Sequence, residues 1–389
     1  MITRAFVLFL TLLAGPAAAG QLTLAQVFTG PEHAAYFGWK IGVDGPHVML
    51  SMQDYDALDS RRHTSLRRPD IATGDLGAPV RSHPEWNRNR LYGIPSDGGR
   101  TLLCDAARDS HDTPQRSLLI NTRTGKELAR FENPVPEERW RDRFARSCAL
   151  GGDMAAISYS WTDRETRRRK TEFLLYDTET GALRDRLRTP DTYGVILFRR
   201  SIDMDSRHIA VGTTGVDMKT GYFGRVDLYD RETRTHLRSF RRPPNGIPYN
   251  DGAFGYNTLL RGDHLIVSAT YDSEVGREGG TVWIFDIDSG EIVREITSPL
   301  RAKNSEFGIA LALWNGRLLI GQPDARVEGK RDAGAVWVFD DETGDLLQGL
   351  VAPDISSGGR FGERLAAGLA GVLTTDAHSG DGGAVFLYR

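Results

Sequence analysis

Residues 307–340, FGIALALWNGRLLIGQPDARVEGKRDAGAVWVFD, decide the fold of this chain. An aromatic-glycine pair opens the stretch, two apolar runs flank a tight Asn315-Gly316 turn, and a third apolar run ends at Asp340. This pattern is typical of a β-hairpin extended by a third strand. A shorter copy follows, from Phe361-Gly362 to Tyr388. Repetition at this interval predicts a repeat architecture.

Aromatic-glycine pairs like Phe307-Gly308 recur along the whole chain, and each marks the start of a repeat unit. Including one degenerate copy, they lie near residues 37, 92, 144, 193, 254, 307 and 361, at intervals of 49 to 61 residues. This is the length of a four-stranded propeller blade with its loops. Most units continue into an Asp-x-x-Thr/Ser-Gly turn, such as Asp286 to Gly290, in which Gly accepts the left-handed conformation. A fourth strand follows each turn.

The last unit ends at Arg389, directly after its third strand. Residues 22–28 have the pattern of the missing fourth strand and precede the first start at Phe37-Gly38. Pairing these residues with the last unit would close a ring and cover its exposed strand edges. We therefore predict an all-β fold: a single seven-bladed β-propeller over residues 20–389, with four antiparallel strands per blade and the N-terminal strand completing the last blade.

Residues 1–19 have the pattern of a secretory signal peptide, with Arg4 before an apolar stretch and a small-residue cleavage site that ends at Ala19. The apolar stretch is too short to cross a bilayer, and no later stretch is long enough. We expect a secreted or periplasmic protein after cleavage near Ala19, with no membrane span. The net charge of −3, spread over mixed signs, gives no reason to expect a nucleic-acid partner, and we expect a monomer.

Two cysteines, Cys104 and Cys148, are present in the chain. In an oxidising compartment they could form a disulfide. The alternative is two small apolar side chains buried in neighbouring strands. Both interpretations stay open, whereas metal binding by two isolated cysteines is disfavoured.

The Phe-Gly starts, the second strand ending in Gly321-Gln322-Pro323-Asp324 and the third strand Gly-Ala-Val-Trp-Val-Phe resemble FG-GAP repeats. These repeats build the seven-bladed propeller of integrin α subunits and many bacterial secreted proteins. The resemblance is clearest over residues 254–388, and it implies a binding or adhesion module, although some relatives are linked to enzymes acting on lipids. Repeats of this family often bind calcium between their first two strands. Here those connections are tight turns, too short to supply six to eight oxygen ligands, so calcium is disfavoured and no cofactor or metal is expected.

Binding residues are expected on the face of the ring that carries the long loops, opposite the tight turns. An aspartate recurs after the second strand of most units, and aromatic residues lie on the same predicted face. These aspartates either form a partly acidic binding surface or cap the backbone of each loop, and the capping interpretation is favoured. The candidate ligand-binding residues are Asp54, Asp105, Trp161, Tyr222, Tyr271, Asp272, Asp324 and Asp376.

The favoured function is a protein- or glycan-binding, adhesion or scaffold module that acts through its long-loop face. The alternative is a propeller hydrolase or lyase with a site at the mouth of the central channel. A quinoprotein-like dehydrogenase is disfavoured, because the vicinal cysteines and repeated tryptophan motif of that class are absent from the sequence. The common catalytic motifs for nucleophiles, zinc and phosphates are also absent, so we predict no catalytic residues, and catalysis is the less favoured interpretation. Convergent histidines and carboxylates at the channel mouth would favour an enzyme, and an open aromatic surface would favour binding.

Overall fold

The computed structural model describes residues 20–31, 37–56, 61–83, 91–107, 115–134, 143–163, 165, 169–188, 195–217, 221–243, 252–272, 279–300, 304–376 and 383–389. The predicted signal peptide and the predicted unit start near residue 193 lie outside these residues.

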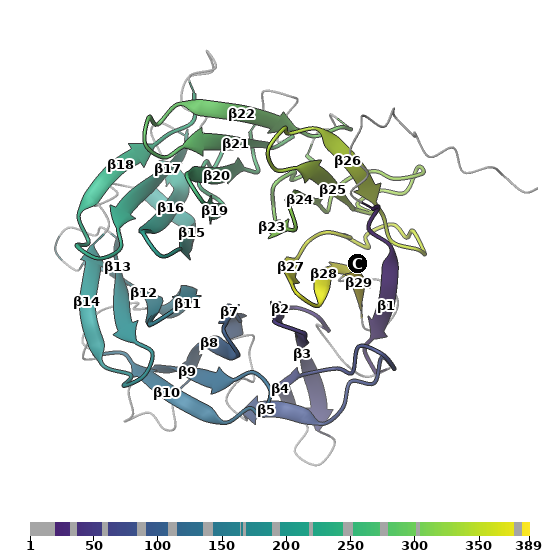
Figure 1. Ribbon diagram of the computed structural model, residues 1–389, viewed down its shortest axis with the longest axis horizontal. Helices are drawn as coiled ribbons and strands as arrows, with labels where there is room; N and C mark the ends of the chain where they lie inside the picture. The colour runs from purple at the N-terminus through teal and green to yellow at the C-terminus, as the bar shows by residue number, and fades with distance from the viewer. Residues whose placement is uncertain are drawn as a thin grey trace, which may run out of the picture.

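The chain forms seven sheets of β-strands arranged in a ring around a central axis (Figure 1). Blades 1 to 3 contain, from the inner to the outer strand, β2 (Ile41–Asp44), β3 (His47–Asp56), β4 (Arg61–Arg67) and β5 (Pro79–His83); β6 (Leu91–Gly93) with β7 (Ser96–Asp97), β8 (Arg100–Ala107), β9 (Arg116–Asn121) and β10 (Glu127–Glu132); and β11 (Arg143–Gly151), β12 (Met154–Thr162), β13 (Arg169–Asp177) and β14 (Leu183–Arg188). Blades 4 to 7 contain β15 (Val195–Met204), β16 (His208–Asp217), β17 (Gly221–Asp230) and β18 (His236–Phe240); β19 (Thr258–Arg261), β20 (His264–Ala269), β21 (Thr281–Asp286) and β22 (Ile292–Thr297); β23 (Leu311–Trp314), β24 (Arg317–Gln322), β25 (Ala335–Asp340) and β26 (Leu346–Leu350); and β27 (Leu365–Gly368), β28 (Gly371–Asp376), β29 (Ala384–Tyr388) and β1 (Leu24–Thr29).

The prediction of a seven-bladed propeller closed by its N-terminal strand is confirmed. Strand β1 pairs antiparallel with β29, with Val27 opposite Phe386 and Phe28 opposite Val385. In Figure 1 the purple β1 lies on the outside of the yellow blade 7. Phe28 is fully buried, so this strand contributes to the core between blades as well as to the pairing.

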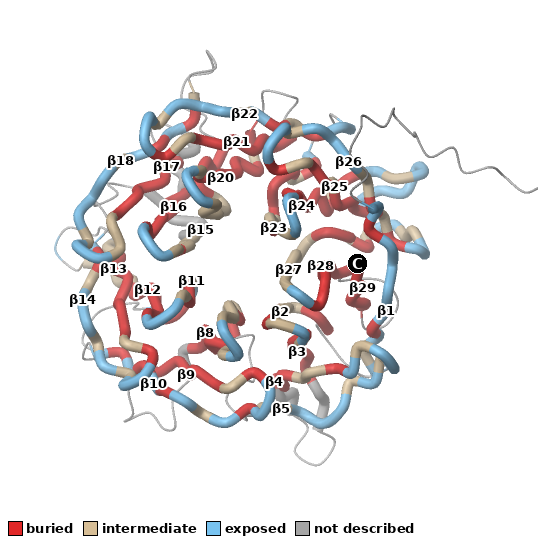
Figure 2. The backbone as a smooth tube through the Cα atoms, viewed as in Figure 1, coloured by how far each residue is buried: buried red, intermediate tan, exposed pale blue. Residues whose placement is uncertain are grey.

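Burial decreases from the middle of each blade towards its outer strand (Figure 2). In blade 5 the first five residues of β21 are buried, whereas Ile296 is the one buried residue of β22, and Ile292 and Val293 are exposed. The middle strands are apolar on both faces because neighbouring blades cover both faces. The aromatic residue that opens each repeat packs between blades: Phe254, with no exposed surface, belongs to one cluster with Val226 of blade 4 and Trp283 of blade 5.

The glycine of the Asp-x-x-Thr/Ser-Gly turn has a second role that the sequence did not reveal. A Cβ atom on Gly125 would lie 2.4 Å from the carbonyl oxygen of Val80, and one on Gly181 would lie 2.7 Å from that of Arg130. In both cases the neighbour belongs to the outer strand of the preceding blade. The glycine therefore permits close packing of adjacent blades as well as a positive φ.

The two faces of the ring differ. Tight turns join the inner strand of each blade to the next strand on one face, which faces the viewer in Figure 1. The connections between blades and those that follow the second strands lie on the opposite, long-loop face, as the antiparallel order requires. Within the described parts of the chain, no helix is long and apolar enough to cross a membrane.

Candidate functional site

Three of the candidate aspartates lie inside the blades. Asp105, Asp272 and Asp376 expose 2%, 0% and 1% of their surface. Asp272 accepts hydrogen bonds from Arg242 (Nη2 to Oδ1, 2.6 Å) and from Thr281 (Oγ1 to Oδ2, 2.8 Å). A ligand on the surface of the ring cannot reach these carboxylates.

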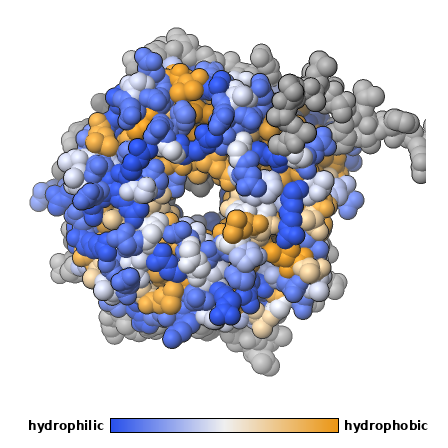
Figure 3. All heavy atoms as spheres, viewed as in Figure 1, coloured by the Kyte–Doolittle hydropathy of each residue, from blue (hydrophilic) through white to orange (hydrophobic). Residues whose placement is uncertain are grey.

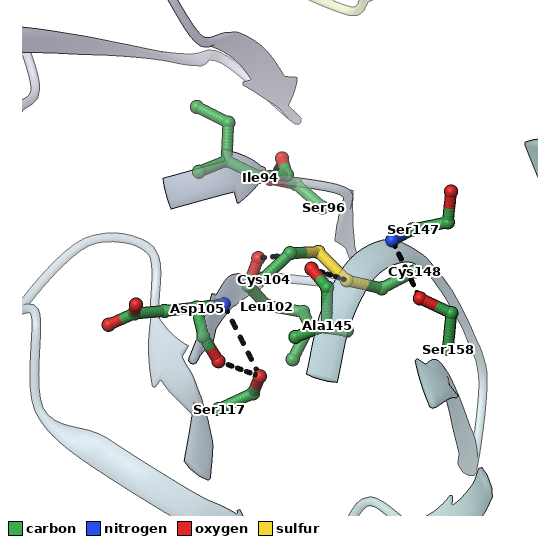
Figure 4. Close-up of a disulfide and its surroundings, with 10 residues drawn as sticks. All are labelled: Ile94, Ser96, Leu102, Cys104, Asp105, Ser117, Ala145, Ser147, Cys148 and Ser158. Carbon is green, nitrogen blue, oxygen red and sulfur yellow. Dashed lines mark hydrogen bonds between the residues drawn. A yellow bond between two sulfur atoms is a disulfide. The ribbon is translucent and has the colours of Figure 1, made fainter. Parts of the chain in front are cut away.

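Asp105 lies next to a disulfide that joins blade 2 to blade 3 (Figure 4). Cys104 of β8 and Cys148 of β11 are linked, with their Cα atoms 6.1 Å apart. The backbone carbonyl of Asp105 accepts a hydrogen bond from the hydroxyl of Ser117 (2.7 Å). The structure therefore places Cys104 and Cys148 in a covalent link between two blades, and Asp105 next to Cys104 in β8.

Asp324 differs from the other aspartates because it is only partly buried and belongs to a charged cluster at the boundary between blades 6 and 7. The guanidinium of Arg360 pairs with Asp324, with Glu306 (Nη2 to Oε2, 3.0 Å) and with Glu363 (Nε to Oε2, 3.0 Å). Burial and the nearby Glu306 carboxylate raise the pKa of Asp324 to about 6, against the opposing effect of Arg360. One cation therefore fixes three carboxylates from two blades.

The backbone around this cluster is strained. Glu306, Asp332 and Arg360 adopt φ values of 53°, 52° and 58°, in the left-handed region that side chains other than glycine rarely occupy. The amide of Arg360 donates to the carbonyl of Asp332 (2.9 Å), and this bond attaches the long loop after β24 to the connection that leads into blade 7. Strain of this kind persists only where surrounding contacts fix the conformation.

The candidate aromatic residues are partly accounted for by packing. Trp161 stacks on Tyr159 with ring centroids 5.3 Å apart, and Tyr271 lies edge-on to Tyr256 at 6.0 Å. The side chains of Asp54 and Tyr222 lie outside the described part of the structure.

A set of aromatic and cationic side chains that the sequence analysis missed lies where the chain enters the inner strands on the long-loop face. The guanidinium of Arg364 lies 4.9 Å from the ring centroid of Trp39, and the ammonium of Lys40 lies 5.6 Å from the same ring. Arg146 lies 5.2 Å from the ring of Tyr92. We call these five residues, together with Tyr256, the channel-mouth group.

The sequence contains a pattern that could have identified part of the channel-mouth group. Trp39, Arg146 and Tyr256 each stand two residues after the aromatic residue that opens a repeat. The backbone amide of the following residue donates to a serine of the second strand in blades 1, 3 and 5, at 2.9, 2.9 and 3.1 Å. The repeat therefore fixes the backbone next to this position in the same way in each of these blades.

One described cluster contains the residue types of a hydrolytic triad, on the outer part of blade 4. Nε2 of His236 lies 3.0 Å from Oγ of Ser239 and 3.5 Å from Oδ1 of Asp227, and the Ser239 hydroxyl donates directly to that Oδ1 (2.6 Å). A relay requires the two ring nitrogens to contact the two partners separately. Here one nitrogen faces both, so the cluster is a cross-strand polar contact between β17 and β18.

No group of three or more His, Cys, Asp or Glu suited to holding a metal ion occurs among the residues that the structure describes.

Comparisons with known proteins support the architecture. No protein-family model matches the chain, and no curated protein matches it. The solved β-propeller domain of Myceliophteria thermophila Cps50 (Swd1) matches with a TM-score of 0.56 and 12% identity, over 92% of this chain and 99% of that one. A europium-containing methanol dehydrogenase matches with a TM-score of 0.47 and 10% identity, over 95% and 93% of the two chains. At 12% identity the Cps50 match supports the propeller fold alone, and the likeness to FG-GAP repeats remains a resemblance.

Proposed function

We propose that this chain is a secreted or periplasmic propeller, similar to FG-GAP proteins, that binds a protein or glycan through its long-loop face and acts as an adhesion or scaffold module. The observation that carries the proposal is the channel-mouth group. Half-buried aromatic rings beside cationic side chains offer both an apolar surface and charge to a partner.

The other features of this face are consistent with a rigid binding surface. Arg360 fixes the long loop and the inter-blade connections around it, so a partner would meet a preformed arrangement. The described Ser-His-Asp cluster lacks the geometry of a hydrolytic relay. The link between Cys104 and Cys148 suits an oxidising compartment and supports the proposed location outside the cytoplasm.

A glycan array and chemical cross-linking with the chain from residue 20 onwards test the proposal. The variant Arg146→Ala removes an exposed cation of the channel-mouth group, and Tyr256→Ala removes an aromatic ring. Leu237→Ser, on an exposed outer strand, is the control. We expect at least one retained ligand whose binding falls about tenfold in each channel-mouth variant and is unchanged in the control. Equal binding by all variants, or no retained ligand in either assay, would refute the proposal.

A further inference from the structure

An unusual turn lies on the opposite face of the ring. In six blades the tight turn after the inner strand contains Gly, Asn, Asp or Ser, whereas blade 7 has Leu369-Ala370 at this position. Leu369 is 87% exposed, and the next most exposed large apolar side chain among the described residues, Leu237, is 50% exposed. Figure 3 shows an apolar patch beside the central opening, at the position of the β27–β28 turn in Figure 1. A single exposed leucine needs no explanation, but an apolar patch beside a hollow is a candidate contact surface.

A hollow of about 620 Å³ adjoins this turn. Its described lining comes from the inner strands and tight turns of four consecutive blades, 6, 7, 1 and 2. Its walls include Trp314, Leu313 and Val43, and the glycine-rich turns at Gly45 and Gly98 add peptide groups. The hollow is open to solvent rather than enclosed.

The contacts between neighbouring turns differ around the ring. Arginine side chains join the turns of blades 2 and 3 (Arg100 Nη2 to the carbonyl of Gly152, 2.7 Å) and of blades 4 and 5 (Arg207 Nη2 to the carbonyl of Gly262, 3.2 Å). Beside the hollow, the indole Nε1 of Trp314 in blade 6 donates to the carbonyl of Gly368 in blade 7 (2.9 Å). The backbone amide of Ala370 in blade 7 donates to the carbonyl of Gly45 in blade 1 (3.0 Å). Neutral groups therefore make these two contacts between blades. Two guanidinium groups lie close by, that of Arg317 at 5.5 Å from the ring centroid of Trp314 and that of Arg389 on the carbonyl of Ala370 (2.9 Å).

Few charged groups line the hollow itself. The ionisable residues among its described lining are Asp44 and Asp97. Asp44 is buried and accepts the amide of Gly99 (3.0 Å). The Asp97 carboxylate is 44% exposed; its Oδ2 accepts the amide of Gly152 (2.8 Å) and lies 3.5 Å from Arg100, so Oδ1 is the oxygen that a partner cation would meet. The hollow thus combines an apolar wall with an accessible carboxylate at its rim.

We propose that this hollow binds a peptide segment of a partner protein in which a large apolar side chain stands next to a lysine or arginine. The apolar side chain would contact Trp314 and Leu369, and the cation would pair with Asp97. The exposed Leu369 would become buried on binding, which favours association. This site lies on the face opposite the channel-mouth group, so its test does not depend on the function proposed above. If both faces bind, the ring could join two partners.

Three capped tripeptides test the proposal by saturation-transfer NMR: Gly-Trp-Lys, Gly-Trp-Glu and Gly-Ser-Lys. We expect Gly-Trp-Lys to bind with a Kd in the millimolar range, and the other two at least about fivefold more weakly. Leu369→Ser should weaken binding of Gly-Trp-Lys about tenfold, and the matched control Leu237→Ser should leave it unchanged. Asp97→Asn should remove the preference for the lysine peptide over the glutamate peptide.

Several results would overturn the assignment: no binding of Gly-Trp-Lys, equal binding of the lysine and glutamate peptides, or equal effects of Leu369→Ser and Leu237→Ser. Sedimentation at the same concentration identifies the competing occupant. We expect a monomer, and a dimer that Leu369→Ser dissociates would assign the hollow to a second copy of the chain.

Discussion

Closure of the ring by β1 makes Phe28 the most direct test of the fold. This side chain has no exposed surface and packs in one cluster with Phe37, Leu50 and Val385. Phe28→Ala would remove a buried ring that blades 7 and 1 share, and changes of this kind cost about 3 to 5 kcal/mol. Because domains are stable by about 5 to 15 kcal/mol, this single change would remove a large fraction of the free energy of unfolding.

The neighbouring Val27 is the matched control, because it lies on the same strand and is 37% exposed. Val27→Ala should change the free energy of unfolding by about 0.5 kcal/mol or less. Both variants keep the backbone pairing with β29, so their difference reports side-chain packing at the closure. Urea denaturation followed by tryptophan fluorescence measures both values. If Phe28→Ala lies within about 1 kcal/mol of Val27→Ala, β1 does not contribute to the core as described.

Three further predictions use the same assay. Gly334→Ala should lower the free energy of unfolding by about 3 kcal/mol, because the new Cβ would lie 2.2 Å from the carbonyl oxygen of Phe361. Gly262→Ala should lower it by about 1 kcal/mol, since nothing lies within 4 Å of a Cβ there and only the positive φ is unfavourable. Equal losses would contradict the close approach of blades 6 and 7. The folded-state pKa of Asp324, about 6, exceeds the unperturbed 3.8, so its contribution to stability is present below the unfolded-state pKa and is lost as the pH rises through 6. Asp324→Asn should therefore reduce the loss of stability between about pH 4 and about pH 7, and an unchanged profile would show that the carboxyl is not perturbed. Replacing Cys104 and Cys148 by serine should lower the free energy of unfolding by about 4 kcal/mol. The wild-type protein in reducing agent should lose a similar amount of stability. No loss in either case would mean that the disulfide is not formed.

The repeat pattern predicted the blades well because each blade is built from contacts close in sequence. The apolar run at residues 335–339 and the turn that begins at Asp340 define a third strand and its end without reference to the rest of the chain. The missing fourth strand of the last unit predicted the pairing of β1 with β29, since a propeller with unequal blades would leave a strand edge exposed.

The candidate site was harder to predict. Asp272 and Asp324 occupy the same place in the repeat, yet the first is fully buried with Arg242 and the second is half-buried beside Arg360. Their partners come from different inter-blade connections, whose sequences do not repeat. Spacing alone could not distinguish an interior ion pair from a surface cluster.

The sequence by itself determined the number of blades, the tight turns and the strand that closes the ring, because periodic apolar residues and turn residues act locally. Only the tertiary structure decided which side chains meet between blades. Trp39 and Arg364 lie 325 positions apart in the chain, yet the closed ring brings the ring centroid and the guanidinium within 4.9 Å. The same closure places the exposed Leu369 beside Trp314 and the turns of blades 1 and 2. A local pattern specifies each blade, but the side chains of both candidate surfaces come from different blades and meet only in the closed ring.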